Sequence, residues 1–279
     1  MQVPINGAEL EVDVLGDPDA PVLIAHHGAP GIGSRAEPRT SFGPLSDSYR
    51  VIVFDARGSG ASSDTPPYTH AQWAADVDAL REWAGVEQIV MAGGSYGGFV
   101  ALEYALAYPE RVRALVLRDT AAADTFRGTA RQRALDTDRT TIDMELFDRS
   151  FSGQVRDDDD FKETWKAILP LYDYDYDPSA VEAKANAPTY HYRTHNYAFS
   201  TNLPGYDIRA RLGEIICPTL ITVGRVDWIT PVEASEELAA GIPGAQLAIF
   251  EKSGHSPQIE EHDAWLATVR EFLRKVDDR

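Results

Sequence analysis

A serine in a glycine-rich stretch lies in a pattern that is typical of nucleophilic catalysis. Residues 93–97 read Gly-Gly-Ser-Tyr-Gly, after an apolar run at 88–92 that predicts a buried strand and before a segment at 99–105 that predicts a helix. A serine on such a turn forms a nucleophile elbow, whose strained backbone projects the hydroxyl outward. A plain glycine-rich turn can have the same five letters. The pattern therefore predicts a nucleophile at Ser95 only if a base and an acid accompany it.

Two later loops supply these partners. Asp227 follows the predicted strand 219–223, and His255 follows the predicted strand 246–250. A serine hydroxyl needs a base to accept its proton and an acid to orient that base. Because parallel strands end at one edge of a sheet, the loops that follow them meet there. The order Ser, Asp, His is the one used by α/β hydrolases, so Ser95, Asp227 and His255 are predicted to form a catalytic triad.

The negatively charged oxygen of an acyl-transfer intermediate needs hydrogen-bond donors. One donor is expected to be the backbone N–H of Tyr96, directly after the nucleophile. The other is expected in the loop His26-His27-Gly28-Ala29-Pro30-Gly31, which follows the predicted strand 22–26. We assign it to the N–H of Ala29, and we expect His27 to brace the loop by hydrogen bonding.

The remaining pattern supplies elements that bring these loops together. Strands and helices alternate along both ends of the chain, which predicts an α/β fold with a mostly parallel central sheet and helices on both faces. The predicted strands are 9–15, 22–26, 51–55, 88–92, 112–117, 219–223 and 246–250, and the predicted helices are 70–84, 99–105, 231–240 and 264–273. Between 119 and 205 the pattern changes to helical stretches rich in aromatic residues. We expect a core of 1–118 and 206–279 and a helical cap insertion of 119–205.

Composition excludes several classes of partner. The chain has 279 residues, 43% of them hydrophobic, with 44 acidic and 26 basic side chains and a formal net charge of -18. Such an excess repels nucleic acid and anionic membrane surfaces, so we expect neither as a partner. The longest apolar runs have strand length, and no secretory signal is visible, so a cytoplasmic protein is expected. The oligomeric state stays open.

Neither the one cysteine nor the aspartate runs predict a metal site. Cys217 precedes an apolar strand and is expected to be a buried hydrophobe. The run Asp157–Asp160 and the alternating aspartates of 173–177 lie in a segment that is no more acidic than the rest of the chain. They are expected to be a solvated surface or helix N-caps.

Four motifs resemble those of the α/β-hydrolase superfamily, and more narrowly those of proline iminopeptidases and their relatives. The loop 27–31 is similar to H-G-G-P-G with Ala29 in place of a glycine, and 55–60 is similar to D-x-R-G-x-G, a structural loop. The segments 93–98 and 224–227 complete the resemblance, which covers 1–118 and 206–279. It implies the α/β-hydrolase fold, a helical cap over the serine, a Ser-His-Asp mechanism and no cofactor.

One position departs from that pattern. In proline iminopeptidases an acidic residue commonly follows the triad aspartate and binds the substrate's free amine together with a cap glutamate, whereas Trp228 stands here. Two substrate classes therefore stay open. One is the N-terminal proline or another small residue of a short peptide; the other is the neutral ester, lactone or amide of a small molecule. We expect Gly28, Trp228 and Tyr197 to line the substrate pocket, with Glu145, Glu163, Asp173 or Asp175 as possible replacements for the missing acid.

A different class of function also fits the scaffold. An aromatic-lined cap over a deep pocket suits a ligand receptor that turns over slowly or not at all. The complete triad argues against this alternative. A serine nucleophile disfavours haloalkane dehalogenase and epoxide hydrolase chemistry, which uses an aspartate nucleophile, and leaves C–C bond hydrolysis as a minor alternative.

Overall fold

The computed structural model describes residues 1–278 and contains one eight-stranded sheet. Its strands follow the order β1-β2-β4-β3-β5-β6-β7-β8. The pairs β1–β2 and β2–β4 are antiparallel, and all the others are parallel. The strands are β1 Gln2–Ile5, β2 Ala8–Leu15, β3 Val22–His26, β4 Arg50–Phe54, β5 Ile89–Gly94, β6 Val112–Arg118, β7 Thr219–Gly224 and β8 Gln246–Phe250.

Helices cover both faces of this sheet because the strands present apolar side chains on both. In β5, Val90 and Ala92 contact one hydrophobic cluster, while Ile89 and Met91 contact the other, as the two-residue period of a strand requires. Helices α1 (Ala36–Phe42) and α11 (His262–Asp277) pack on the first face. Helices α2 (His70–Ala84), α3 (Tyr96–Ala107) and α9 (Val232–Gly241) pack on the second.

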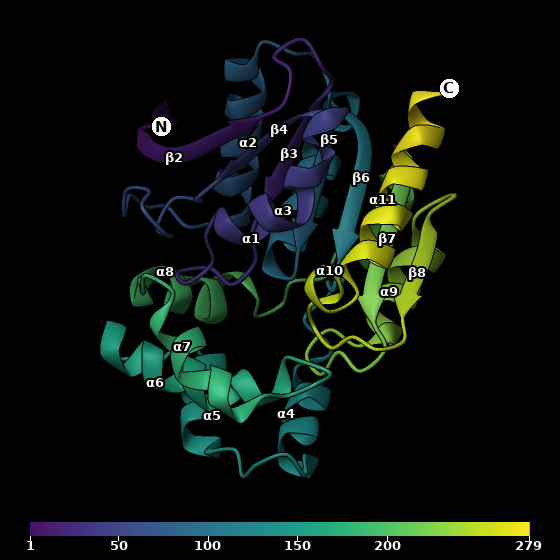
Figure 1. Cartoon of the computed structure of the whole chain (residues 1–279). Coiled ribbons are helices and arrows are strands. Elements are labelled where there is room, and N and C mark those ends of the chain that lie inside the picture. Colours follow the sequence, from purple (N-terminus) through teal and green to yellow (C-terminus); the bar gives the residue numbers. More distant parts are fainter. Residues whose placement is uncertain (279) are drawn as a thin grey trace.

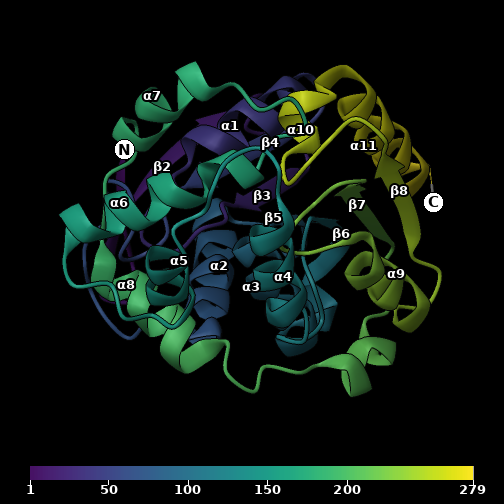
Figure 2. The same cartoon turned by 90° about the horizontal axis from the view of Figure 1, so that it is seen from below.

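The chain between β6 and β7 forms a separate group of helices beyond the carboxyl ends of the parallel strands (Figure 1). Seen from below, these helices lie across the end of the sheet (Figure 2). They are α4 Arg127–Asp136, α5 Met144–Phe151, α6 Asp158–Ile168, α7 Val181–Asn186 and α8 Tyr192–Tyr197. Asp157 caps α6 by accepting a hydrogen bond from the N–H of Asp160, as expected for an aspartate run at a helix start.

The structure confirms the predicted strands and the helix at 70–84, and it adds three elements. These are β1, α1 and the single turn α10 (Pro257–Glu260). Each is short, and β1 and α1 contain Pro4 and Pro38, so their local pattern is weak. Pro231 was expected within the first turn of α9 and is instead its N-cap residue. Among residues 1–278, no helix has the length and apolar character to cross a membrane.

A buried ion pair holds the loop after β4. Arg57 donates to both carboxylate oxygens of Asp76 on α2, at 2.6 and 2.7 Å, and each side chain is 1% exposed. Asp55 in the same loop accepts hydrogen bonds from the backbone N–H groups of Arg35 and Ala61. These contacts agree with the structural role expected for this loop.

Removing one member of the buried pair should destabilise the protein strongly. We expect Asp76→Ala to lower the free energy of unfolding by about 3–5 kcal/mol, because it leaves the Arg57 guanidinium buried without a counter-charge. The exposed pair of Arg131 with Asp148 is a matched control, and Asp148→Ala should cost at most about 1 kcal/mol. Urea unfolding of both variants measures the difference. Equal losses would contradict the assigned role of the buried pair.

Candidate active site

The turn between β5 and α3 has the backbone of a strained elbow. Ser95 lies at φ 53° and ψ −123°, a conformation that residues with a side chain rarely adopt. Its neighbours must be small because the turn is closely packed. A Cβ on Gly97 would lie 2.6 Å from the carbonyl oxygens of His26 and His27, and one on Gly93 would collide with the carbonyl of Gly97. The glycines of the motif are thus required by packing.

His255 and Asp227 form a buried hydrogen-bonded pair, in which His255 Nδ1 lies 2.8 Å from Asp227 Oδ2. Asp227 also accepts hydrogen bonds from the N–H groups of Ile229 and Thr230 and from the Thr230 hydroxyl. The His255 backbone is fixed by its N–H, which donates to the Tyr172 carbonyl at 2.8 Å. The imidazole is therefore held with Nδ1 toward the carboxylate, and within residues 1–278 its Nε2 makes no hydrogen bond.

The protonation of His255 and Asp227 depends on two opposing effects, burial and the charges of neighbouring groups. Burial disfavours the imidazolium, but the charge and hydrogen bond of Asp227, with a smaller contribution from the charge of Asp119, outweigh it and raise the pKa of His255 above its ordinary value. Burial likewise opposes ionisation of Asp227, and the His255 charge with the donated hydrogen bonds brings the pKa of that carboxyl below its ordinary value. The pair is suited to accept a proton on the imidazole.

Two backbone N–H groups near the serine are available as donors. Ala29 lies at φ 46°, and within residues 1–278 no recorded hydrogen bond uses its N–H or that of Tyr96. The loop is braced as expected, since His27 Nε2 accepts the N–H of Ala56 at 3.0 Å and His27 Nδ1 lies 2.7 Å from the Gly28 carbonyl. With Nε2 accepting, Nδ1 carries the proton.

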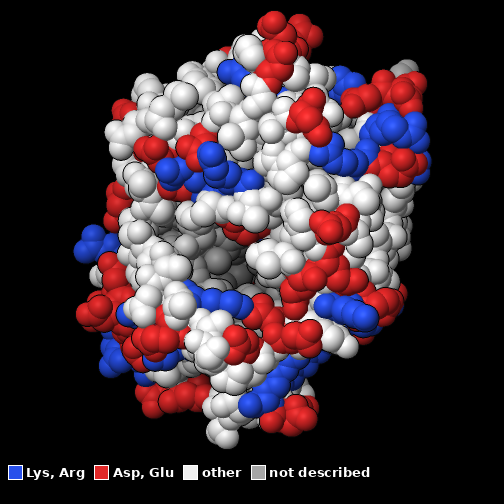
Figure 3. Space-filling model, in the orientation of Figure 1, with Lys and Arg blue, Asp and Glu red and all other residues white. Residues whose placement is uncertain are grey.

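A cavity with about 850 Å³ of unfilled space, part of it open to solvent, adjoins these groups. The surface in Figure 3 is hollowed between the core and the helices below it. Ala29, Ser95, Tyr96 and Thr230 form part of the cavity wall. Most of the rest is apolar and comes from the segment between β6 and β7, including Phe126, Phe151, Phe161, Trp165, Ile168 and Phe199. This size and lining suit a small organic substrate.

The three residues expected to line the pocket have different positions. Gly28 lies directly beside the serine, where a Cβ on it would be 2.9 Å from Ser95 Cβ. Trp228 is 3% exposed and packs against Phe147, Phe151 and Tyr172 behind the cavity wall. Tyr197 packs edge-on against Tyr68 and is not part of the wall either. In its place Phe199, two residues further along, reaches the cavity.

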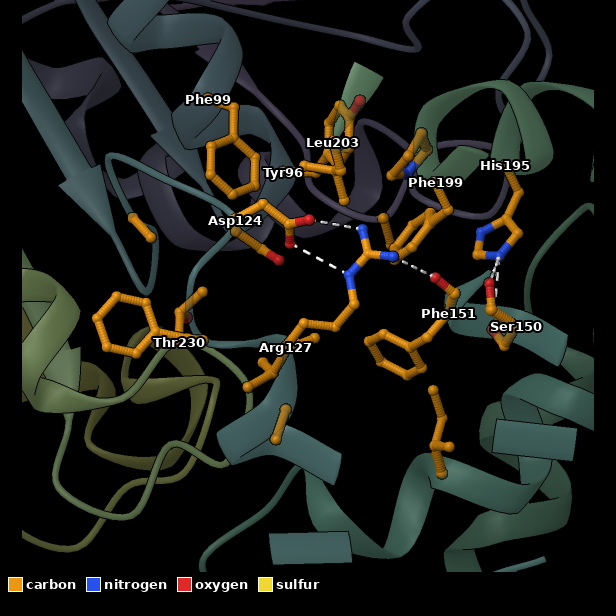
Figure 4. A pocket seen from close by; sticks show the side chains of 18 of the residues that line it. Tyr96, Phe99, Asp124, Arg127, Ser150, Phe151, His195, Phe199, Leu203 and Thr230 are labelled. Atoms are coloured by element: carbon orange, nitrogen blue, oxygen red, sulfur yellow. Dashed lines mark hydrogen bonds and ion pairs between the residues drawn. The ribbon is translucent and has the colours of Figure 1, made fainter. Parts of the chain in front are cut away.

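A charged pair that the sequence analysis did not single out lies on the cavity wall. Arg127 Nη2 is 2.9 Å from one oxygen of Asp124, and Arg127 Nη1 donates to the Phe151 carbonyl at 2.9 Å (Figure 4). Burial raises the pKa of Asp124, while Arg127 opposes that rise. The acids considered earlier, such as Glu145 and Asp173, instead pair with Arg149 and Lys184 outside the cavity. Tertiary packing alone places Asp124 on the cavity wall and the other acids outside it, so the sequence could not distinguish them.

Another buried acid lies beside the His255–Asp227 pair. Polar atoms of Asp119, Asp227 and His255 come within 4.8 Å of one another, as in some metal sites. However, Asp119 accepts the N–H of Gly224 at 3.0 Å and faces the Arg118 guanidinium at 3.2 Å. A metal ion would have to displace these donors and lie next to a fixed positive charge, so this set of side chains fits acid–base chemistry.

A family model described as alpha/beta hydrolase fold matches residues 21–262. The chain belongs to the α/β-hydrolase family. This confirms the predicted fold class and the expectation of a hydrolase enzyme. A proline iminopeptidase, PfmaB of Pestalotiopsis fici, is 37% identical to this α/β hydrolase over 98% of this chain and 99% of that protein. A 2-hydroxymuconate semialdehyde hydrolase of Pseudomonas putida is 31% identical over 92% of this chain and 88% of that protein.

Solved structures agree with this family. A thermophilic esterase from Thermogutta terrifontis superposes with a TM-score of 0.77 at 27% identity, covering 99% of this α/β hydrolase and 98% of that chain. A meta-cleavage product hydrolase, CumD, gives 0.78 at 23% identity and supports the fold alone. Proline iminopeptidase, semialdehyde hydrolase and esterase names thus all occur among the proteins that this chain resembles.

The raised pKa of His255 predicts where activity is lost in acid. As the predicted general base, His255 must be neutral to accept a proton, so kcat/KM should fall as the pH drops through the pKa of His255, with a midpoint above 6.5. Initial rates between pH 5 and 9 measure this midpoint. Circular dichroism over the same range separates proton uptake by the base from unfolding. A midpoint at or below 6.5 in the folded protein would disagree with the geometry of the pair.

Proposed function

We propose that this α/β hydrolase is a serine hydrolase that cleaves a small amide or ester through an acyl-enzyme intermediate. The observation that carries the proposal is the serine on a strained elbow at the wall of an apolar cavity, with a hydrogen-bonded His255–Asp227 pair on loops at the same edge of the sheet. Residues 119–205 act in this proposal as the cap that closes the cavity over Ser95.

Each residue has a defined task in the reaction. Ser95 Oγ attacks the substrate carbonyl carbon while His255 Nε2 takes the hydroxyl proton. Asp227 holds the imidazole and stabilises its positive charge, and the N–H groups of Ala29 and Tyr96 bind the oxyanion. The imidazolium then gives its proton to the leaving group. A water molecule, deprotonated by the same imidazole, releases the acyl group and restores the free serine.

The first substrate candidate is the N-terminal residue of a short peptide or amide, with proline iminopeptidase-like activity. The 37% identical relative supports it. Asp124 is the acid on the cavity wall that could bind a free amine, because its carboxylate is 20% exposed. It would replace the acidic residue that Trp228 displaces from the usual position.

The second candidate is the neutral ester, lactone or amide of a small molecule. The apolar lining favours it, and so does the neutralisation of Asp124 by Arg127. An ammonium ion next to this pair would meet a carboxylate whose charge is already balanced. A neutral acyl group would instead be bound by the aromatic wall without losing hydration of a charge.

A paired rate assay separates these candidates. The substrates are proline p-nitroanilide, its N-acetylated form and p-nitrophenyl acetate, each with wild type and Ser95→Ala. We expect the substitution to lower turnover by about a thousandfold or more, since it removes the nucleophile. Preference for the free-amine substrate supports the peptidase, and ester turnover alone supports the second candidate. Equal inactivity of both proteins on all three would favour a ligand receptor.

Asp124 provides a direct test of amine recognition. If the protein is an aminopeptidase, Asp124→Asn should lower kcat/KM for proline p-nitroanilide about tenfold or more. The reason is that the substitution removes the charge-assisted hydrogen bond between the substrate amine and the carboxylate. Turnover of p-nitrophenyl acetate should stay within about threefold. Asp148→Asn at an exposed position serves as the control. An equal fall with both substrates would show that Asp124 supports the cavity wall rather than a substrate amine.

A further inference from the structure

Asp119 is a buried carboxylate that the mechanism above does not use. It directly follows β6, it is 0% exposed, and its backbone lies at φ 46°. One carboxylate oxygen accepts the N–H of Gly224 at 3.0 Å, and the other lies 3.2 Å from Arg118 Nη1. These two partners compensate the cost of desolvating the carboxylate, so a charged group is tolerated directly beside the reacting residues.

Its neighbours are the two groups that carry the acid–base chemistry. Polar atoms of Asp119, Asp227 and His255 lie within 4.8 Å of one another, and the three residues are at most 5% exposed. At such a separation in a buried site, the charge of one group changes the protonation of the next. We propose that Asp119 is a second acid of the site, a positioning residue that acts through His255 and partly replaces Asp227. This rests on the proposed function.

The charges around His255 show why one acid alone would be weaker. Asp227 faces it from the loop after β7, Asp119 from the end of β6, and Arg118 is bonded to its carbonyl oxygen at 3.2 Å. Tyr172 contacts the ring from the cap, and Glu37 on α1 lies 3.3 Å from Arg118. Asp227 has the largest stabilising effect on the imidazolium, and the charge of Arg118 opposes it. Asp119 adds a second negative charge on the stabilising side.

The protonation of Asp119 is consistent with this role. Burial and the charge of Asp227 raise the pKa of Asp119 to about 7. Two carboxylates this close cannot both ionise freely, so they share charge with the imidazole as one coupled group.

The backbone at Asp119 permits clean substitutions. A positive φ is adopted easily by glycine and tolerated by asparagine. Asp119→Asn keeps the size of the side chain and an acceptor for the N–H of Gly224, whereas Asp119→Gly removes the side chain and keeps the turn. Asp47→Asn is a matched control, because that aspartate is exposed and pairs with Arg270 away from the site.

The first experiment measures the pH dependence of kcat/KM. Its substrate is whichever of the three named above the wild-type protein cleaves fastest. In both Asp119 variants the acidic midpoint should fall by about half a pH unit or more, since the imidazolium loses a stabilising charge. Asp47→Asn should leave it unchanged. Thermal melts identify which Asp119 variant is folded, and one folded variant suffices. An unmoved midpoint in a folded variant overturns the proposal.

A second experiment tests whether Asp119 supports His255 when Asp227 is neutral. Asp119→Asn alone should lower kcat by no more than about threefold, whereas adding it to Asp227→Asn should cause about a tenfold further loss. Equal rates for Asp227→Asn and the double variant would overturn the proposal. If the two rates are equal and Ser95→Ala is still inactive, the proposal for Asp119 is wrong but the proposed hydrolase function stands. Turnover that survives Ser95→Ala would instead refute the proposed function.

Discussion

The close approach of α3 to the loop after β3 is the constraint on which the site depends. In the parallel pairing of β3 with β5, His26 lies opposite Gly93, so the loop that begins at His27 runs beside the serine turn. Side chains at positions 28 or 97 would push these backbones apart. One packing requirement therefore places the nucleophile and both proposed oxyanion donors together, at the cost of a strained serine that its neighbours hold in place.

The order of the strands determines the electrostatics of the site. Strands β5, β6, β7 and β8 are consecutive in the sheet, and the residues after them bring Ser95, Asp119, Asp227 and His255 to one edge. Two carboxylates this close in a buried space repel one another unless a cation lies nearby. Arg118, at the end of β6, supplies that charge from within the sheet and also fixes the His255 carbonyl.

The sequence predicts the parts of this arrangement that depend on local pattern and chain order. Apolar runs predict β3, β5 and β8, and the order of Ser95, Asp227 and His255 predicts their shared edge. The pocket is different, because the face that a cap helix turns inward is decided by packing between distant segments. Trp228 and Phe199 illustrate this: both are aromatic residues in suitable places, yet only Phe199 reaches the cavity. Asp119 also follows a predicted strand and lies between Ser95 and His255 in the chain, as Asp227 does, so only packing shows that both acids lie beside His255.

The polar pair in the cavity shows how the same fold can serve different substrates. Arg127 is the first residue of α4 and Asp124 lies three residues before it, and their guanidinium–carboxylate contact leaves the wall nearly neutral. A carboxylate without Arg127 would attract an ammonium ion but would be costly to bury in an aromatic cavity when no substrate is bound. Arg127 lowers that cost and also weakens the attraction. In the proposed function, substrate choice is therefore a balance between stabilising an empty cavity and binding a charged group in it, and the core sheet does not determine that balance.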